Sequence, residues 1–262
     1  MTSSATSRGL LGGLATLGLT LGMLMTSGAP AGAATWPSAN GSQAVSATIS
    51  VSGTKDYGMK QLYGSGDLGS DSQDEDQGPL LELAPGTVLK NVIIGSPAAD
   101  GIHCLGSCTL QNVWWEDVGE DAATFLGSSS SNVYTVSGGG AKEASDKVFQ
   151  FNGAGTLNVS GFAVKNFGTF ARSCGNCKTQ YKRTINLSGI EATYKGSKLV
   201  GINTNYGDSA TLRNITIVGD TGKKIIPCQK YIGNNTGKEP TTNGSDPDGT
   251  YCKYSGSDIT YK

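Results

Sequence analysis

The first regular pattern after residue 43 is an alternation of apolar and polar side chains. The stretch from Ala44 to Ser52 reads Ala-Val-Ser-Ala-Thr-Ile-Ser-Val-Ser, and a period of two predicts a half-buried strand. Later segments repeat short runs of Val, Ile and Thr, separated by Gly, Ser and Asn. Few runs have the Leu-rich period of a helix, so the chain is predicted to be all-β.

A repeat begins near residue 88. Each copy carries an asparagine followed by β-branched or aromatic residues, as in Val88–Gly95 and Thr109–Trp115. The aligned asparagines are Asn91, Asn112, Asn132, Asn158, Asn186 and Asn214. Spacings in the twenties are typical of stacked coils, which bury a continuous core only together. We expect these asparagines at bends, where their backbone tolerates the left-handed conformation and their amides bond the next coil.

Among repeat architectures, this pattern favours a single-stranded parallel β-helix, a solenoid. A leucine-rich horseshoe has a similar period, but here Val, Ile and Thr dominate and the insertions are irregular. A β-sandwich would place its strands 8–12 residues apart with hairpin turns.

The expected domain organisation has three parts. Residues 1–33 read as a signal peptide: Arg8, an apolar run over residues 9–25, and a small-residue cleavage site at Ala31-Gly-Ala33. A membrane anchor is the alternative, but glycines interrupt the run and no later stretch is long enough to span a bilayer. Residues 34–43 are a short flexible lead-in, and 44–262 form the β-helix domain. We therefore expect a secreted protein with no membrane partner.

Six cysteines follow the signal segment, and an even number in an exported chain implies disulfides. Their spacing suggests the pairs Cys104–Cys108, Cys174–Cys177 and Cys228–Cys252. Half a zinc site at Cys174 and Cys177 is the alternative, disfavoured by a single histidine in the chain. Beyond about residue 227 the repeat fades, and the tail is expected to cap the solenoid.

The charge composition limits the classes of ligand that the protein can bind. Only 16% of the residues are charged and the formal net charge is −1, which excludes the basic surface that nucleic acid requires. An acidic ligand would need a local basic patch or a bound cation.

Such a patch is predicted where acidic and basic residues recur about one coil apart. Asp100, the pair Glu120–Asp121, Lys147 and Arg172 would project from one face of successive coils. Clustered carboxylates suit Ca²⁺, a hard cation that takes six to eight oxygens. A cation beside a lysine and an arginine suits attack on an anionic sugar polymer, because it acidifies the C5 hydrogen of a bound uronate. A lysine or arginine then removes that proton, and a lysine base favours alkaline pH.

Neighbouring residues receive more ordinary interpretations. His103 is expected to be a hydrogen-bonded structural residue at a bend. Of Trp114 and Trp115, one must point inward, so at most one can be a sugar platform. Gln150 either orients substrate or stacks in its coil, and a basic run at residues 178–183 either is a solvated face or extends a cleft for a polyanion. Glu116 and Asp117 rank below the other acids.

Four blocks carry a family resemblance. Asp100–Cys104, Asn112–Thr124, Asp146–Gly153 and Arg172–Cys177 resemble the signature blocks of the pectate lyases of polysaccharide lyase family 3. The resemblance covers residues 44 to 262. It implies a right-handed parallel β-helix, Ca²⁺ dependence, and endo-type cleavage of polygalacturonate (pectate) to unsaturated products. We expect this enzyme to be a monomer.

The resemblance also implies residue roles. Asp100, Glu120 and Asp121 match the calcium-binding acids, Lys147 the base, and Arg172 the arginine at the substrate carboxylate. Glu75 matches an acidic residue of the substrate cleft. One departure stands out: a lysine often precedes the arginine by three residues, and here that position is Thr169. Weaker binding, or use of Lys165 instead, would follow.

Two rivals remain at this point. A polygalacturonase-type hydrolase needs paired carboxylates as acid and base, and Glu120–Asp121 is the one well-placed pair. A non-catalytic pectin-binding β-helix would bind pectate without creating new chain ends.

Overall fold

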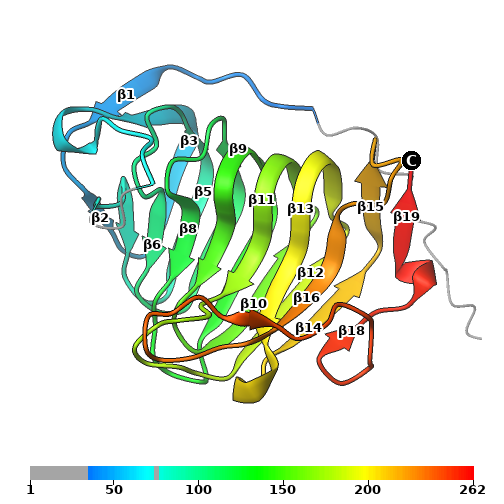
Figure 1. The fold of residues 1–262 in the computed structure, drawn as a ribbon. Helices are drawn as coiled ribbons and strands as arrows, with labels where there is room; N and C mark the ends of the chain where they lie inside the picture. Colours follow the sequence, from blue (N-terminus) through cyan, green and yellow to red (C-terminus); the bar gives the residue numbers. More distant parts are fainter. Residues whose placement is uncertain (1–34, 74–76) are drawn as a thin grey trace, which may run out of the picture. The chain divides into compact units, whose positions relative to one another are not determined.

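Three short strands joined by bends make up each coil of the chain, and successive coils stack along one axis (Figure 1). The computed structural model describes residues 35–73 and 77–262, so the expected signal peptide and Glu75 lie outside the described residues. Thr35 is the first described residue of the lead-in, and the first strand, β1, spans Ser42–Val45. No helix among the described residues is long and apolar enough to cross a membrane.

One face of the stack, here called the site sheet, carries the candidate functional residues. Its strands pair in parallel, and each coil contributes one. They are β2 (Ile49–Val51), β4 (Leu81–Leu83), β6 (Ile102–Cys104), β8 (Asp121–Phe125), the ends of β9 (Val133–Phe151), β11 (Ala163–Ser173) and β13 (Glu191–Asn203), and β16 (Ile226–Ile232).

Two further parallel sheets complete each coil. The second contains the start of β3 (Thr54–Gly64), β5 (Thr87–Ile94), β7 (Cys108–Trp115), the start of β9, β10 (Gly155–Ser160), β12 (Arg183–Ser188), β14 (Ser209–Arg213) and β18 (Cys252–Lys253). The third contains β1, the later parts of β3, β5 and β7, the middle of β9, the starts of β11 and β13, then β15 (Ile215–Val218) and β19 (Ile259–Tyr261).

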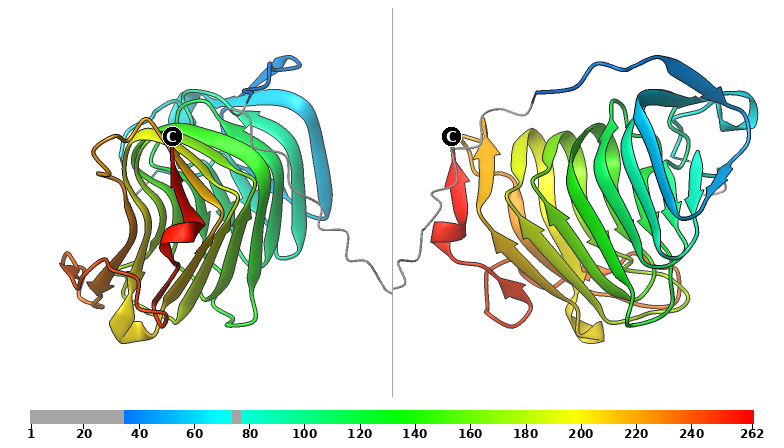
Figure 2. Two further views of the ribbon diagram at one scale, coloured as in Figure 1. Left: turned by 90° about the vertical axis from the view of Figure 1, so that its right-hand side faces the viewer. Right: turned by 180° about the vertical axis from the view of Figure 1, so that it is seen from behind.

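This arrangement confirms the predicted fold class. Parallel neighbours in each sheet are joined by a crossover through the other two sheets, and such crossovers are right-handed. The left view of Figure 2 looks along the stack and shows the successive coils lying over one another. The chain is thus a right-handed, single-stranded parallel β-helix.

The interior is filled by side chains that stack from coil to coil. Phe149 packs on Trp115, Phe125 and Phe170, with ring centroids 5.3–6.1 Å apart, and all four side chains are fully buried. Trp114 points the other way, but Trp36 packs against it with ring centroids 4.9 Å apart, and it is 9% exposed. Neither tryptophan of the pair therefore offers an open platform for a sugar.

One bend recurs in the same place between the second and third sheets. Its residue has positive φ in six successive coils, and the six are Asn91, Asn112, Gly138, Gly161, Gly189 and Asn214. Asn112 donates a hydrogen bond to Asn91 Oδ1 (2.8 Å), as expected for a ladder of bend asparagines.

The predicted alignment was wrong for three other asparagines. Asn158 and Asn186 lie within strands β10 and β12, where Asn186 donates to Asn158 Oδ1 (2.9 Å), and Asn132 lies just before β9. In their coils glycine occupies the bend, because glycine adopts positive φ without steric cost.

The tail closes the far end of the stack. β18 pairs with β14, and β19 pairs with β15. The tail strands β18 and β19 therefore cover the edges of β14 and β15. The expected disulfides Cys104–Cys108, Cys174–Cys177 and Cys228–Cys252 are all present. β17 (Thr241–Thr242) lies within the polar loop and pairs antiparallel with β16.

Candidate active site

The three predicted acidic residues converge at one end of two neighbouring site-sheet strands. Asp100 lies in the bend before β6, and Glu120 and Asp121 stand at the start of β8. One oxygen from each carboxylate lies within 4.8 Å of the others, and the residues are 8%, 4% and 2% exposed. The structure therefore brings these three together, while Glu116 and Asp117 stand outside the group.

Close backbone packing fixes this convergence. A Cβ at Gly119 would lie 2.1 Å from the carbonyl oxygen of Ala99, and one at Gly101 would lie 2.2 Å from that of Ala122. Both positions therefore require glycine. Asp71 supports the same bend, because its carboxylate accepts the Ala98 N–H and the Ser96 hydroxyl, each at 2.5 Å.

Two carboxylate oxygens of the acid cluster have no hydrogen-bond donor. Asp100 Oδ2 contacts His103 Nε2 at 2.6 Å, which matches the structural role expected for the histidine. The other oxygen, Asp100 Oδ1, and the Asp121 Oδ1 atom are buried and accept no hydrogen bond. Buried carboxylate oxygens without donors are costly unless a cation balances them. The cluster fits an oxygen-binding divalent cation such as Ca²⁺.

Burial also sets the protonation of these acids. Desolvation raises the pKa of Asp121 well above its ordinary value, and that of Glu120 also rises, in spite of the nearby Lys147 ammonium. Mutual repulsion among carboxylates adds to the effect on Asp121. A bound cation would remove this cost.

Lys147 is the basic residue nearest the acids. β9 places it in register with Asp121 of β8. Its Nζ atom lies 3.3 Å from Glu120 Oε1, 3.5 Å from Asp121 Oδ1 and 2.5 Å from Asp146 Oδ2. Burial by itself lowers the pKa of Lys147, but these carboxylates outweigh it and the net pKa is raised.

Arg172 follows in the next coil, in register with Gln150. Its guanidinium stacks on the Tyr231 ring, with the carbon 4.0 Å from the centroid, and Nη1 donates to the Ser173 carbonyl at 2.7 Å. Burial lowers the pKa of Arg172, but an arginine still carries its charge at neutral pH. Gln150 Oε1 is buried without a hydrogen-bond partner.

A cleft of about 270 Å³ lies beside Lys147 and Arg172. Among its lining residues are Lys147, Gln150, Arg172, Lys198, Tyr231 and Glu239. The last three were not identified from the sequence. Lys198 is in register with Thr169 and continues the predicted column by one coil, whereas Tyr231 and Glu239 come from the tail, where the repeat has faded.

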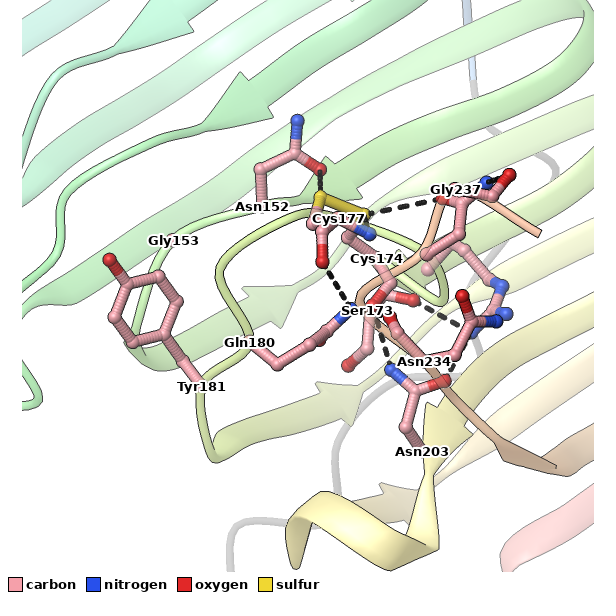
Figure 3. The surroundings of a disulfide bond; sticks show 12 residues. Asn152, Gly153, Ser173, Cys174, Cys177, Gln180, Tyr181, Asn203, Asn234 and Gly237 are labelled. Atoms are coloured by element: carbon pink, nitrogen blue, oxygen red, sulfur yellow. Dashed lines mark hydrogen bonds between the residues drawn. A yellow bond between two sulfur atoms is a disulfide. The ribbon is translucent and has the colours of Figure 1, made fainter. Parts of the chain in front are cut away.

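The tail contacts the loop between Cys174 and Cys177 and the residue Gln180 that follows it (Figure 3). Gln180 Nε2 donates to the carbonyls of Cys177 (3.2 Å) and Asn234 (2.9 Å). The Asn234 N–H in turn donates to the Gly175 carbonyl at 2.8 Å. The disulfide loop therefore positions a segment that is distant in sequence.

Both interpretations of the basic run, a solvated face and an extension of a polyanion cleft, were wrong for Arg183. Arg183 is fully buried, and its guanidinium donates to the carbonyls of Gly153 and Asn152, each at 2.7 Å. Because every one of these contacts is internal, the residue stabilises the loops beneath the cleft instead of binding a ligand.

Comparisons with known proteins agree on one family. Residues 33–238 match the family model described as "Pectate lyase". Pectate lyase E of Emericella nidulans is 47% identical over 222 residues, 84% of either chain. The probable pectate lyase E of Aspergillus clavatus is 46% identical over 83% of either chain.

Solved structures lead to the same group. The catalytic domain of pectate lyase PelI from Erwinia chrysanthemi matches with a TM-score of 0.69 and 33% identity, over 84% of this chain and all of that domain. The longer PelI chain gives a TM-score of 0.70 at 31% identity, over 86% of this chain and 72% of that one. One PelI structure was solved in complex with tetragalacturonic acid, with a TM-score of 0.69 and 30% identity over 84% of this chain and 70% of that one.

Proposed function

The chain belongs to the pectate lyase family, and from this premise we propose that it cleaves α-1,4-linked polygalacturonate by calcium-assisted β-elimination. One observation carries the proposal. A buried cluster of three carboxylates with unsatisfied oxygens lies against a lysine, and that lysine lines a cleft together with an arginine. Such a site holds a cation, a base and an anion-binding group together.

In this proposal Asp100, Glu120 and Asp121 hold Ca²⁺. When bound, the ion supplies positive charge that draws electrons from the uronate carboxylate and acidifies the C5 hydrogen. Arg172 binds a substrate carboxylate through its planar fork of donors, and the Tyr231 ring holds that fork in orientation.

Lys147 takes the C5 proton at Nζ. The carbon–hydrogen electron pair becomes the C4–C5 double bond, and the C4–oxygen bond breaks, so the leaving oxygen departs with its electron pair and acquires a proton. The products are a 4,5-unsaturated oligogalacturonide and a new chain end. The pKa of Lys147 is raised by the acids that hold the metal in this proposal. With their charge neutralised this cause disappears, and the amine accepts a proton best at alkaline pH.

Secretion is part of the proposal. Three disulfides are formed in the structure, and such bonds persist in oxidising compartments outside the cytosol. The substrate is a polymer outside cells, and a monomer with the cleft on its side would act on it without a protein partner.

The proposed function is tested by ultraviolet absorbance of polygalacturonate digests with Ca²⁺, without added Ca²⁺, and with excess chelator. We expect unsaturated product with Ca²⁺ alone, and recovery when Ca²⁺ again exceeds the chelator. Full turnover in chelator would refute the metal role. New reducing ends without the absorbance would indicate a hydrolase, and binding without new ends would indicate a non-catalytic module.

A further inference from the structure

A third cationic residue, after Lys147 and Arg172, lines the cleft two coils from Lys147. Strand register pairs Lys147 of β9 with Thr169 of β11, and Thr169 with Lys198 of β13. Neighbouring strands lie about 4.8 Å apart, so the two lysines are about 10 Å apart along the stack at the level of the backbone. Both line the same cleft.

The two lysines differ in the carboxylates that surround each ammonium group. Lys147 has three carboxylates within 3.5 Å. Lys198 Nζ donates to the Ser197 hydroxyl at 3.0 Å, and it has no ion pair with any residue in the described part of the chain. Its positive charge is therefore available to an anion that enters the cleft.

Thr169 lies between the two lysines in the strand register. Thr169 is 8% exposed and carries no charge, so it does not neutralise Lys198, and the charged residue of this coil, Arg172, lies three residues further along the same strand. An acidic polymer with a carboxylate on every unit can place different carboxylates beside positions that lie about 10 Å apart along the stack.

We propose that Lys198 binds the carboxylate of a second uronate unit, distinct from the unit held beside Lys147 and Arg172. This inference rests on the proposed function, because it takes the ligand to be a polyuronate. Lys198 then determines affinity for the polymer and leaves the chemical step to Lys147. An ammonium–carboxylate contact in a partly exposed cleft is expected to contribute about tenfold in affinity.

The test compares Lys198→Gln and Lys198→Arg with Lys195→Gln as the matched control. Lys195 lies on the same strand, is exposed and does not line the cleft. With polygalacturonate and Ca²⁺, Lys198→Gln should raise KM about tenfold with kcat within about twofold, and its KM should depend less on salt. Lys198→Arg should retain most of the affinity, because it retains the charge. A KM for Lys198→Gln equal to that of Lys195→Gln would overturn the proposal.

Two further arms separate the alternatives. Lys165→Gln tests the lysine suggested by sequence, which is exposed and outside the cleft lining; a KM increase there, with none for Lys198→Gln, would transfer the contact to Lys165. Direct binding of polygalacturonate, measured by calorimetry in a Lys147→Ala background, does not need turnover. Absence of an unsaturated product with the wild-type enzyme would reject the proposed reaction. Equal binding of polygalacturonate by Lys147→Ala with and without Lys198→Gln would reject the Lys198 contact.

Discussion

At the scale of single residues, the candidate site is an arrangement of charged side chains around Lys147. The acids, Lys147 and Arg172 were predictable because they recur about one coil apart, and stacking converts that spacing into proximity. The buried position of Arg183 was not predictable, because a sequence shows a charge but not the carbonyl groups that surround it. Lys198 was not predicted for another reason: the predicted column of charged residues ended at Arg172, one coil before Lys198.

Lys147→Ala should abolish formation of unsaturated product, with a loss of at least about 10²–10⁴-fold, the range that a general base contributes. Calcium binding should persist or tighten, because the ammonium that now neutralises Glu120 and Asp121 is removed. Ultraviolet assays and calorimetric Ca²⁺ titration would measure the two effects, with Lys195→Ala as control. Turnover near the wild-type rate would assign the base to another residue.

At the scale of the coil, the recurring bend defines the repeat. Asn91, Asn112 and Asn214 were predictable as bend residues, since asparagine tolerates the left-handed conformation. The bends at Gly138, Gly161 and Gly189 were missed, because glycine is common in this chain and gives no distinctive signal. The predicted alignment therefore matched Asn132, Asn158 and Asn186 with the others, although their coils bend at glycine.

Substitution of Asn112 should separate the backbone requirement from the hydrogen bonds. Asn112 has φ of 55°, donates to Asn91 and accepts the Trp114 indole N–H at 2.7 Å. Asn112→Ala should lower the free energy of unfolding by about 2–3 kcal/mol, since it loses these bonds and forces alanine into the left-handed region. Asn112→Gly should cost about 1 kcal/mol less, because glycine adopts that backbone freely. Urea denaturation would measure both, and equal losses would argue against backbone strain.

At the scale of the whole molecule, the tail links the far end of the stack to the cleft. The loop enclosed by Cys228 and Cys252 supplies Glu239 and Pro240 to the cleft lining. Its last turn is organised by Asp248, which accepts the Lys230 ammonium at 2.9 Å and the Tyr251 N–H at 2.7 Å. The sequence indicated a stapled cap, but not that this cap forms part of the site, because nothing local in a polar loop specifies where it packs.

Asp248→Asn should lower the melting temperature by about 2–4 °C at pH 7, on the order of 1 kcal/mol. Burial alone raises the pKa of Asp248, but the Lys230 ammonium and backbone N–H groups outweigh this and hold that pKa well below its ordinary value. A depressed carboxyl pKa stabilises the fold above the unfolded value of about 3.9, and this stabilisation is lost as pH falls below it. The difference between wild type and variant should therefore shrink from pH 7 to pH 3 in thermal melts. A constant difference would mean that Asp248 acts through its shape alone.

The participation of the tail in the cleft has a consequence for biosynthesis. A chain emerging from the ribosome can stack its early coils and assemble the carboxylate cluster around Asp100 as soon as Lys147 has appeared. It has no complete cleft until Tyr231, Glu239 and Pro240 have been translated and have folded back over the earlier coils. Nascent or prematurely terminated chains are thus expected to lack a complete cleft.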